Sequence, residues 1–586
     1  MLDSRIYRTG LVVVGLAVVV LAFSLQNQQA ALSSSLAPDA FSGQNVYSSM
    51  VSMAAAYPDR PPGSTEDYDL AAHVAQNFRK PGRYGFMVST DTFTGATADG
   101  TRTLENVLAV RPGMESGSIV IVAPRDARGS PATAGLSATA TLIELARDLG
   151  GETLNRTVVL ASTSGSQGES GAIRLASTLN GPIDAVIVLG DVASSSVRQP
   201  IVIPWSSGTR VAPPLLRNTL AAALGAQANL SVGATSLGGQ FAHLAFPLTI
   251  SQQAPFGAQG IPAVELSLSG ERGAAPDAPV GGIDLVTSLG RSVLSTISAL
   301  DGGQTVPAAS AYLLFDGKVV PGWAISLFSL ALIVPVLMTT VDGLARSRRR
   351  GHAVWRWIAL VLAAAIPFAL AALVVFGAQV TGIIAQPPPG PVPAGAVPLH
   401  GAGRAVLGVA GFVALTALVL LRPLSRRIGP RERSREGAPP ALLLVMVLVT
   451  IAIWIDNPFA ALLLAPALHL WLPAINTDLR VPAPVRLLLV LAGLVPVALV
   501  VRYYSASLGY DPLHAAWTAA LLIGGGGVGL PAVLEWSIVL GCVLGAVAIA
   551  ALARAPRAKP APVTVRGPVT YAGPGSLGGT KSALRR

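Results

Sequence analysis

The chain changes its hydrophobic pattern near residue 305. Before that point, short apolar runs rich in β-branched residues alternate with stretches whose apolar positions recur every three or four residues. The short runs predict buried strands and the periodic stretches predict amphipathic helices. Such alternation is typical of an α/β domain with a mostly parallel sheet flanked by helices. We expect strands at 106–110, 118–123, 157–161, 185–189 and 262–266, and helices at 134–149, 171–179, 214–224 and 285–300.

After residue 320 the apolar runs become much longer. A helix of about 20 apolar residues crosses a bilayer, which predicts an α-helical transmembrane bundle over residues 321–553. Together with Leu11–Phe23, the runs give eight or nine spans, depending on whether the glycines at 524–527 break one run into a re-entrant piece. The runs are 321–341, 353–378, 404–421, 439–455, 459–475, 485–501, 514–530 and 533–553.

These patterns divide the chain into five parts. Residues 1–25 are interpreted as a transmembrane anchor, with a cleaved signal peptide as the alternative. Residues 26–305 form the α/β domain, 306–320 a linker and 321–553 a bundle of seven or eight helices. The basic tail, 554–586, is rich in Pro, Gly and Ser, so we expect it to be disordered.

Charge distribution sets the expected orientation. Residues 26–318 hold 22 Asp or Glu and 17 Lys or Arg, although the whole chain carries a net charge of +11. The excess therefore lies in the tail and in arginine clusters between spans, at 346–350 and 422–435, and basic loops stay in the cytoplasm. We expect a multi-pass plasma membrane protein whose α/β domain and Pro-rich loop, 386–397, lie outside the cytoplasm. The clusters reflect topology rather than binding of nucleic acid.

Two motifs carry a family resemblance. Ser251-Gln252-Gln253-Ala254-Pro255-Phe256 leads into Gly260-Ile261-Pro262-Ala263, and Ile143-Glu144-Leu145-Ala146-Arg147 closes a predicted helix. Both resemble motifs of the two-zinc aminopeptidases of family 28 (clan MH). The resemblance begins at Arg60-Pro61-Pro62-Gly63-Ser64 and extends to about residue 300. It implies a zinc-aminopeptidase-like fold for the α/β domain only.

The same resemblance implies that the metal site is degenerate. At the family's five ligand positions only one residue keeps its chemistry, and Ser166 stands at the position of the general base. Proline and alanine have no donor atom, and a carboxamide is a poor zinc ligand. The lone cysteine, Cys542, excludes a cysteine metal site, so we expect no zinc or other cofactor. The five ligand positions hold Pro124, Ala134, Gln167, Asp191 (the retained one) and Gln253.

Four polar residues are candidates for lining the former cleft: Asp126, Asp191, Glu169 and His243. Asp126 and Asp191 follow predicted strands, where ordinary strand-end carboxylates are also common. Glu169 is equally an acidic residue in the first turn of a helix, which the helix dipole favours. Ser166 and Ser170 lack the flanking glycines of a nucleophile elbow.

The layout of an outer peptidase-like domain and many spans is similar to that of the GPI transamidase scaffold subunit and of membrane-embedded endoplasmic-reticulum aminopeptidases. Our leading hypothesis is a non-catalytic scaffold or binding subunit whose cleft holds a peptide, a lipid-linked group or a protein partner. The first alternative is a membrane-bound metallopeptidase or other hydrolase with a remodelled site. The second is a transporter or lipid-handling membrane protein.

Overall fold

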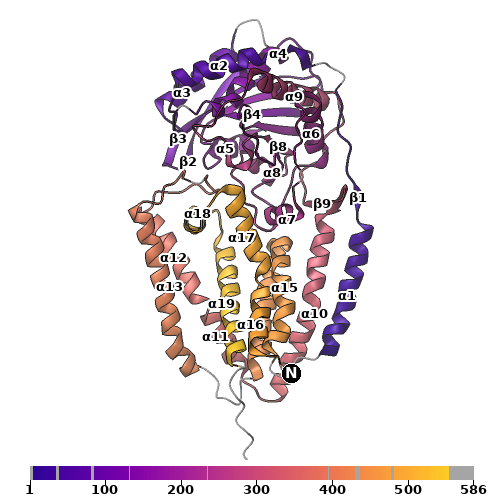
Figure 1. Ribbon diagram of the computed structural model, residues 1–586, viewed down its shortest axis with the longest axis vertical. Coiled ribbons are helices and arrows are strands. Elements are labelled where there is room, and N and C mark those ends of the chain that lie inside the picture. The colour runs from indigo at the N-terminus through magenta and orange to yellow at the C-terminus, as the bar shows by residue number, and fades with distance from the viewer. Residues whose placement is uncertain are drawn as a thin grey trace, which may run out of the picture.

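The computed structural model describes residues 4–552, with gaps at 35–37, 81–84, 131, 234, 394, 429–435, 477–478 and 480. An α/β domain sits on one end of a bundle of long helices (Figure 1). The predicted fold class, a mostly parallel mixed sheet flanked by helices plus a membrane-type helical bundle, is confirmed.

The α/β domain is built on a seven-stranded sheet in the order β2-β3-β5-β4-β6-β8-β7. The four central strands, β5, β4, β6 and β8, run parallel, and β2, β3 and β7 are antiparallel to their neighbours. The strands are β2 (Met87–Thr97), β3 (Gly100–Arg111), β4 (Ser118–Pro124), β5 (Thr157–Thr163), β6 (Ile183–Leu189), β7 (Val202–Ile203) and β8 (Ala263–Leu266).

Helices cover both faces of this sheet. Alternate residues of β4 enter different cores, since Ile119 and Ile121 join one hydrophobic cluster and Val120 and Val122 join another. This period of two explains why the central strands are apolar throughout. On the first face lie α2 (Gly43–Ala56), α3 (Thr65–Phe78), α4 (Ser137–Leu149), α6 (Pro214–Ala228) and α9 (Ile283–Asp301). On the second lie α5 (Ser170–Thr178) and α8 (Ala254–Ala258).

The structure adds strands that the sequence pattern does not reveal. β2 is a long edge strand, and most of its residues are partly or fully exposed. Ser and Thr occupy many of these positions, so the strand has no apolar run. Residues 306–320, expected to be a linker, contain β9 (Tyr312–Phe315) and the start of β10 (Lys318–Pro321). These two strands form a small antiparallel sheet with β1 (Gln26–Asn27).

Seven helical segments within the described residues are long and apolar enough to cross a membrane. An eighth span results if α16 and α17, which meet at a bend of 47°, are taken together. The segments are α1 (Ser4–Phe23), α10 (Gly322–Arg349), α11 with α12 (Val354–Ala363 and Ile366–Val380), α13 (Gly401–Ile428), α14 (Ala438–Asp456), α15 (Pro458–Ile475) and α19 (Leu530–Leu552). The bent pair is α16 (Ala483–Ala492) and α17 (Val495–Leu508).

The run predicted at 514–530 does not form a full span. Its helix, α18 (Pro512–Gly524), has 13 residues and ends at the glycine run, too short for a bilayer. α19 then runs back along the bundle, because a side chain at Gly545 would meet Leu442 near the start of α14. Eight spans therefore place the end of α19 at the same end of the bundle as the start of α1. The predicted disordered tail, 554–586, lies outside the described residues.

Helix α1 is packed into the bundle beside α10 (Figure 1). A Cβ atom added at Gly10 would lie 2.6 Å from Cα of Pro335 in α10, so the two helices meet at a glycine. The hydroxyl of Tyr7 lies 2.7 Å from Nδ1 of His469 in α15, a hydrogen bond between two spans. Helix α1 is therefore held in the bundle by contacts with both α10 and α15.

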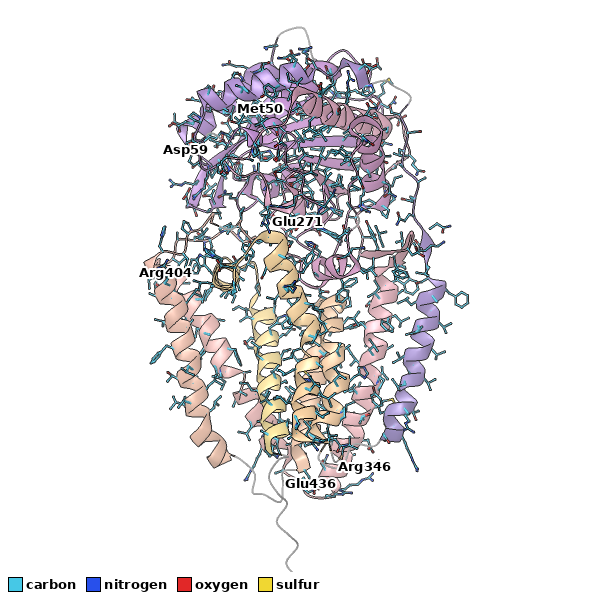
Figure 2. All side chains as sticks on the ribbon, viewed as in Figure 1. Met50, Asp59, Glu271, Arg346, Arg404 and Glu436 are labelled. Carbon is cyan, nitrogen blue, oxygen red and sulfur yellow. The ribbon has the colours of Figure 1, made fainter. Side chains whose placement is uncertain are left out.

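The α/β domain and the bundle share one hydrophobic cluster. Trp205 and Val211 of the domain pack in it with Ile325, Phe459 and Leu463 of the bundle. Polar contacts reinforce the junction: the side-chain amide of Asn457 donates to the carbonyl of Leu244 at 2.8 Å. Glu271 lies at this junction, and Arg346 and Glu436 lie at the opposite end of the bundle (Figure 2).

Candidate functional site

The positions suggested by the family resemblance gather where the parallel strands end. β4 and β6 are adjacent and parallel, so Asp126, two residues after β4, and Asp191, two residues after β6, lie at the same edge of the sheet. Ala134 opens a short 3-10 helix, Ala134–Leu136, beside them. This edge is called the strand-end site, and it comprises Pro124, Asp126, Ala134, Ser166, Gln167, Asp191 and Gln253.

Two positions of the strand-end site have no donor for a metal. Pro124 is the last residue of β4, and its carbonyl accepts a hydrogen bond from the hydroxyl of Thr139 at 3.4 Å. Ala134 is buried, and its carbonyl accepts from the hydroxyl of Ser137 at 2.5 Å. The Ser137 hydroxyl oxygen also accepts from the backbone N–H of Val192. The Ser137 hydroxyl therefore links the short 3-10 helix and the start of α4 to the turn after β6.

Asp191 keeps the family's residue type, but its carboxylate stabilises its own turn. One oxygen accepts from the backbone N–H groups of Ala193 and Ser194, at 3.0 and 2.9 Å. The other accepts from the hydroxyl of Ser269. Burial raises the pKa of Asp191, and these hydrogen bonds oppose that shift. Both oxygens are thus already used within the protein.

Asp126 and Ser166 form a direct pair. Both carboxylate oxygens accept from the backbone N–H of Ser166 at 3.0 Å, and one also accepts from its hydroxyl at 2.8 Å. Burial and the nearby carboxylate of Asp67 raise the pKa of Asp126 to about 6, against the effect of the Ser166 hydrogen bonds. The position of the family's general base therefore holds a hydroxyl that donates to a buried carboxylate.

Gln167 and Gln253 complete the strand-end site with carboxamides. The amide nitrogen of Gln253 donates to the carbonyl of Trp205 at 2.9 Å. The side-chain oxygens of Gln253 and Gln167 are buried and have no hydrogen-bond partner among the described residues. In the part of the chain that the structure describes, no three His, Cys, Asp or Glu residues are grouped so as to hold a metal ion. The residues present do not fit a zinc pair.

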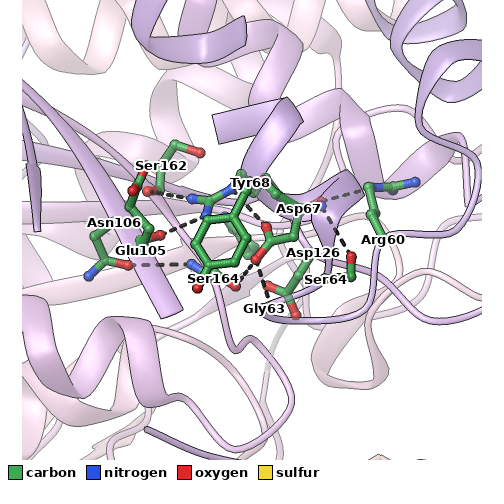
Figure 3. A network of polar contacts seen from close by, with 12 residues as sticks. Arg60, Gly63, Ser64, Asp67, Tyr68, Glu105, Asn106, Asp126, Ser162 and Ser164 are labelled. Carbon is green, nitrogen blue, oxygen red and sulfur yellow. Dashed lines mark hydrogen bonds and ion pairs between the residues drawn. The ribbon is translucent and has the colours of Figure 1, made fainter. Parts of the chain in front are cut away.

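A network of buried arginines holds the strand ends in place (Figure 3). The Arg125 side chain is fully buried and lies 2.8 Å from the carboxylate of Asp67. It also donates to the carbonyls of Ser162 and Glu105. The other oxygen of Asp67 accepts from the hydroxyl of Ser164 at 2.5 Å. This network joins α3, β3, β5 and the loop after β4.

Glu169 belongs to a second group of buried acids. It has a positive φ of 60° and precedes α5, and burial together with Glu265 raises its pKa well above the usual value. Burial and Glu271 raise the pKa of Glu265 to about 8, although Glu265 accepts from the backbone N–H of Gln252 at 2.7 Å. We call Glu169, Glu265 and Glu271 the acidic group.

His243 contacts the membrane bundle. Its ring stacks on Trp205 at 4.5 Å, and its Nε2 lies 3.1 Å from the carboxylate of Glu271. The hydroxyls of Tyr503 and Tyr504 in α17 each lie 3.3 Å from one of its ring nitrogens. The structure thus brings His243 to the acidic group through Glu271.

The Pro-rich loop covers the turn that carries Glu169. A Cβ atom at Gly168, where φ is +107°, would lie 2.4 Å from Cβ of Pro388, so only glycine fits there. A Cβ atom at Gly390 would lie 3.8 Å from the carboxyl carbon of Glu169. The loop is held on its bundle side by Trp517, which donates to the carbonyl of Val397 at 3.1 Å. It is a contact between domain and bundle rather than a free loop.

Sequence reasoning missed Glu265, Glu271, Tyr503 and Tyr504. One signal was present, since Glu265 is a charged residue inside the apolar strand Ala263–Leu266, and such residues are rare unless paired or functional. The two tyrosines lie about 260 residues from His243. No local pattern connects them to it.

Comparisons with known proteins concern the α/β domain. No family model matches the chain, and no curated protein matches it. Among solved structures, a glutaminyl cyclase from an Acidobacteriales bacterium is 18% identical, with 44% of this chain and 95% of that chain covered and a TM-score of 0.34. The Legionella pneumophila aminopeptidase LapA is 16% identical, with coverages of 45% and 73% and a TM-score of 0.35. A zinc aminopeptidase from Bacillus subtilis is 11% identical, with coverages of 44% and 95% and a TM-score of 0.34.

Proposed function

We propose that this protein is a membrane-anchored scaffold whose α/β domain binds a peptide, a lipid-linked group or a protein partner without catalysing metal-dependent hydrolysis. The observation that carries the proposal is the content of the strand-end site. Pro124 and Ala134 offer no metal donor, and the Asp191 carboxylate already accepts hydrogen bonds from its own turn and from the hydroxyl of Ser269. The resemblance of the layout to the GPI transamidase scaffold subunit agrees with this role.

The scaffold proposal predicts that the double variant Asp126→Asn, Asp191→Asn retains function. Asparagine preserves shape and can still accept hydrogen bonds, so we expect at most a modest loss of stability. A hydrolase that used these carboxylates for acid–base chemistry would lose roughly 10²–10⁴-fold in rate. The measurement is complementation of a strain that lacks this protein. If the double variant folds correctly and accumulates normally but does not complement the strain, the proposal is contradicted.

A variant that displaces the Pro-rich loop shows whether the complementation assay responds to damage at this surface. A side chain at Gly527 would come within 1.9 Å of the carbonyl oxygen of Pro389, so Gly527→Val should move the loop and impair function. Gly377→Val is the matched control in the bundle, because nothing lies within 4 Å of a Cβ atom there.

A remodelled hydrolase is the second candidate, and the acidic group is the observation that favours it. Carboxyl groups with strongly raised pKa values are common at catalytic sites, where they act as acids or bases near neutral pH. Glu265, with a pKa of about 8, lies near Glu169 and Glu271. If Glu265→Gln abolishes complementation while the folded protein accumulates normally, the result favours the hydrolase over the scaffold function.

We further propose that the α/β domain lies outside the cytoplasm and that the opposite end of the bundle, with Arg346 and Arg349, lies inside. Cys542 is buried, so single cysteines can be introduced against a low background. A membrane-impermeant maleimide should label Ser177→Cys in intact cells and Arg349→Cys only after permeabilisation. Both residues are exposed in the structure. Labelling of Arg349→Cys from outside would reverse the orientation.

A further inference from the structure

A pocket of about 500 Å³ lies at the domain end of two membrane-spanning helices. Its walls include the first residues of α10 and of α15, together with residues of the α/β domain and of β1. In Figure 1, β1 and β9 lie at the same end of the bundle as the start of α10. We call this the span-end pocket. The lining residues used below are Gln26, Thr209, Ser310, Trp323, Ser326 and Phe459.

The walls of the span-end pocket are held together by hydrogen bonds between segments. The backbone N–H of Gly322 donates to the carbonyl of Ala311 at 2.8 Å, which joins the start of α10 to the residue before β9. The hydroxyl of Ser329 in α10 donates to the carbonyl of Pro458 at 3.0 Å, which joins α10 to the start of α15. The pocket is therefore preformed, as sites for small molecules usually are.

Uncharged groups supply the polar part of the lining. Ser310 is exposed, and Thr209 and Ser326 are half-buried, so all three keep accessible surface. Their hydroxyls take part in no hydrogen bond within the described part of the chain. Gln26 adds an exposed carboxamide. Each of these groups can donate to a ligand and accept from it.

The span-end pocket offers no partner for a charge. Among the residues that the structure describes, no charged side chain belongs to its lining. A helix N-terminus can attract an anion, but that of α15 is capped within the protein. The Asn457 side chain accepts from the backbone N–H groups of Phe459 and Ala460, at 2.9 and 3.2 Å. A charged headgroup would lose hydration here without gaining a partner, so the pocket suits an uncharged polar group.

An exposed apolar face of α10 leads away from the span-end pocket. Trp323, which lines the pocket, is 56% exposed. Leu327, Met338 and Val341 are exposed further along the same helix, and the spacings of 4, 11 and 3 residues place all four side chains on one side of it. A tryptophan at the end of a span is typical of the interface between membrane and water. An acyl chain that lies along this face can therefore reach the pocket with its headgroup at the level of Trp323.

We propose that the span-end pocket binds a membrane lipid of the diacylglycerol type, whose headgroup is uncharged and bears a hydroxyl. The headgroup exchanges hydrogen bonds with the hydroxyls of Thr209, Ser310 and Ser326, and the acyl chains follow the exposed face of α10. A volume of about 500 Å³ lies within the roughly 300–1,000 Å³ of small-molecule sites. The pocket shares no residue with the strand-end site, so this inference goes beyond the scaffold role and does not depend on it.

The test is photocrosslinking of the full-length protein in phosphatidylcholine vesicles that contain a trace of radiolabelled diacylglycerol with a diazirine on one acyl chain. Unlabelled dioleoylglycerol should compete for the labelling until it is saturated. Its 3-acetyl ester lacks the hydroxyl and should need about three- to tenfold more for equal competition, the usual effect of one hydrogen bond. Dioleoyl phosphatidic acid should need more than about tenfold, because its charge would be buried without a partner.

Two variants locate the binding. Ser310→Trp fills the pocket from an exposed position and should lower the competable labelling about tenfold or more. Ser177→Trp, at an exposed position on α5 outside the pocket, is the matched control. The triple variant Thr209→Val, Ser310→Ala, Ser326→Ala removes all three hydroxyls. It should no longer distinguish dioleoylglycerol from the acetyl ester, an effect that a general loss of folded protein would not produce.

Several results would overturn the proposal. If the labelling cannot be saturated, or if Ser310→Trp is labelled as strongly as the control, the lipid contacts the bundle only as part of the surrounding bilayer. Equal competition by the acetyl ester or by phosphatidic acid would show that the pocket does not select an uncharged hydroxyl. The triple variant keeps the test decisive should Ser310→Trp fail to fold. None of these results bears on the scaffold role, which the Asp126 and Asp191 variants test.

Discussion

Replacing Arg125 with methionine should lower the apparent Tm of the purified full-length protein by on the order of 10 °C. The substitution leaves Asp67 as a buried carboxylate without its cation, and breaking a buried ion pair from one side typically costs about 3–5 kcal/mol. Three carbonyl oxygens, those of Asp67, Ser162 and Glu105, also lose a donor. The measurement is thermal unfolding followed by far-UV circular dichroism.

Arg174 provides the matched control. It forms a bidentate pair with Asp91 at 2.8 and 2.9 Å, but its side chain is 41% exposed. Exposed pairs contribute about 0–1 kcal/mol, so Arg174→Met should change the Tm by no more than a few degrees. Equal shifts for the two variants would mean that the buried network of Figure 3 does not hold the strand ends together.

The second large effect concerns pH. Folding raises the pKa of Glu265 from the usual 4.5 to about 8, mainly through burial. The folded state therefore holds a proton that the unfolded state has already lost between these two values. The contribution of Glu265 to the free energy of unfolding is therefore fully present below pH 4.5. It falls as the pH rises towards 8, by up to about 1.4 kcal/mol per pH unit.

Glu265→Gln should remove this part of the pH dependence, because the amide stays neutral and can still accept from the backbone N–H of Gln252. Thermal unfolding from pH 5 to 9 should show a smaller fall in Tm for the variant than for the unmodified protein. Asp126, Glu169 and Asp148, whose pKa values are also raised, contribute with the same sign in both proteins. Glu115→Gln, at an exposed position, is the control. An identical fall in all three proteins would show that Glu265 is not buried as described.

The central strands and the long spans could be predicted from the sequence because their signals are local. Apolar β-branched runs such as Thr157–Thr163 are buried on both faces, so neither face needs polar residues. β2 was not predicted from the sequence, because Ser and Thr at the exposed positions of this edge strand interrupt the apolar pattern. At 514–530 hydropathy alone left two counts open, and the helix that ends at Gly524 agrees with the lower one, in which the glycines break the run.

The candidate site was only partly predictable. The placement of Asp126 and Asp191 at one sheet edge follows from parallel strands, whose carboxyl ends meet there. The environment of His243 does not follow from any local feature, because Tyr503 and Tyr504 come from a helix of the bundle and Glu271 from a short 3-10 helix, Gly270–Arg272. Contacts between distant segments are set by how the bundle docks on the domain.

The loss of zinc-dependent chemistry is the central claim, and the metal content of the purified protein tests it most directly. The full-length protein, freed of any affinity tag, would be prepared from zinc-supplemented cells, dialysed and measured by inductively coupled plasma mass spectrometry. Pro124, Ala134, Gln167 and Gln253 supply no good zinc ligand. We therefore predict far less than stoichiometric zinc, whereas one or more tightly held zinc ions per chain would contradict the account.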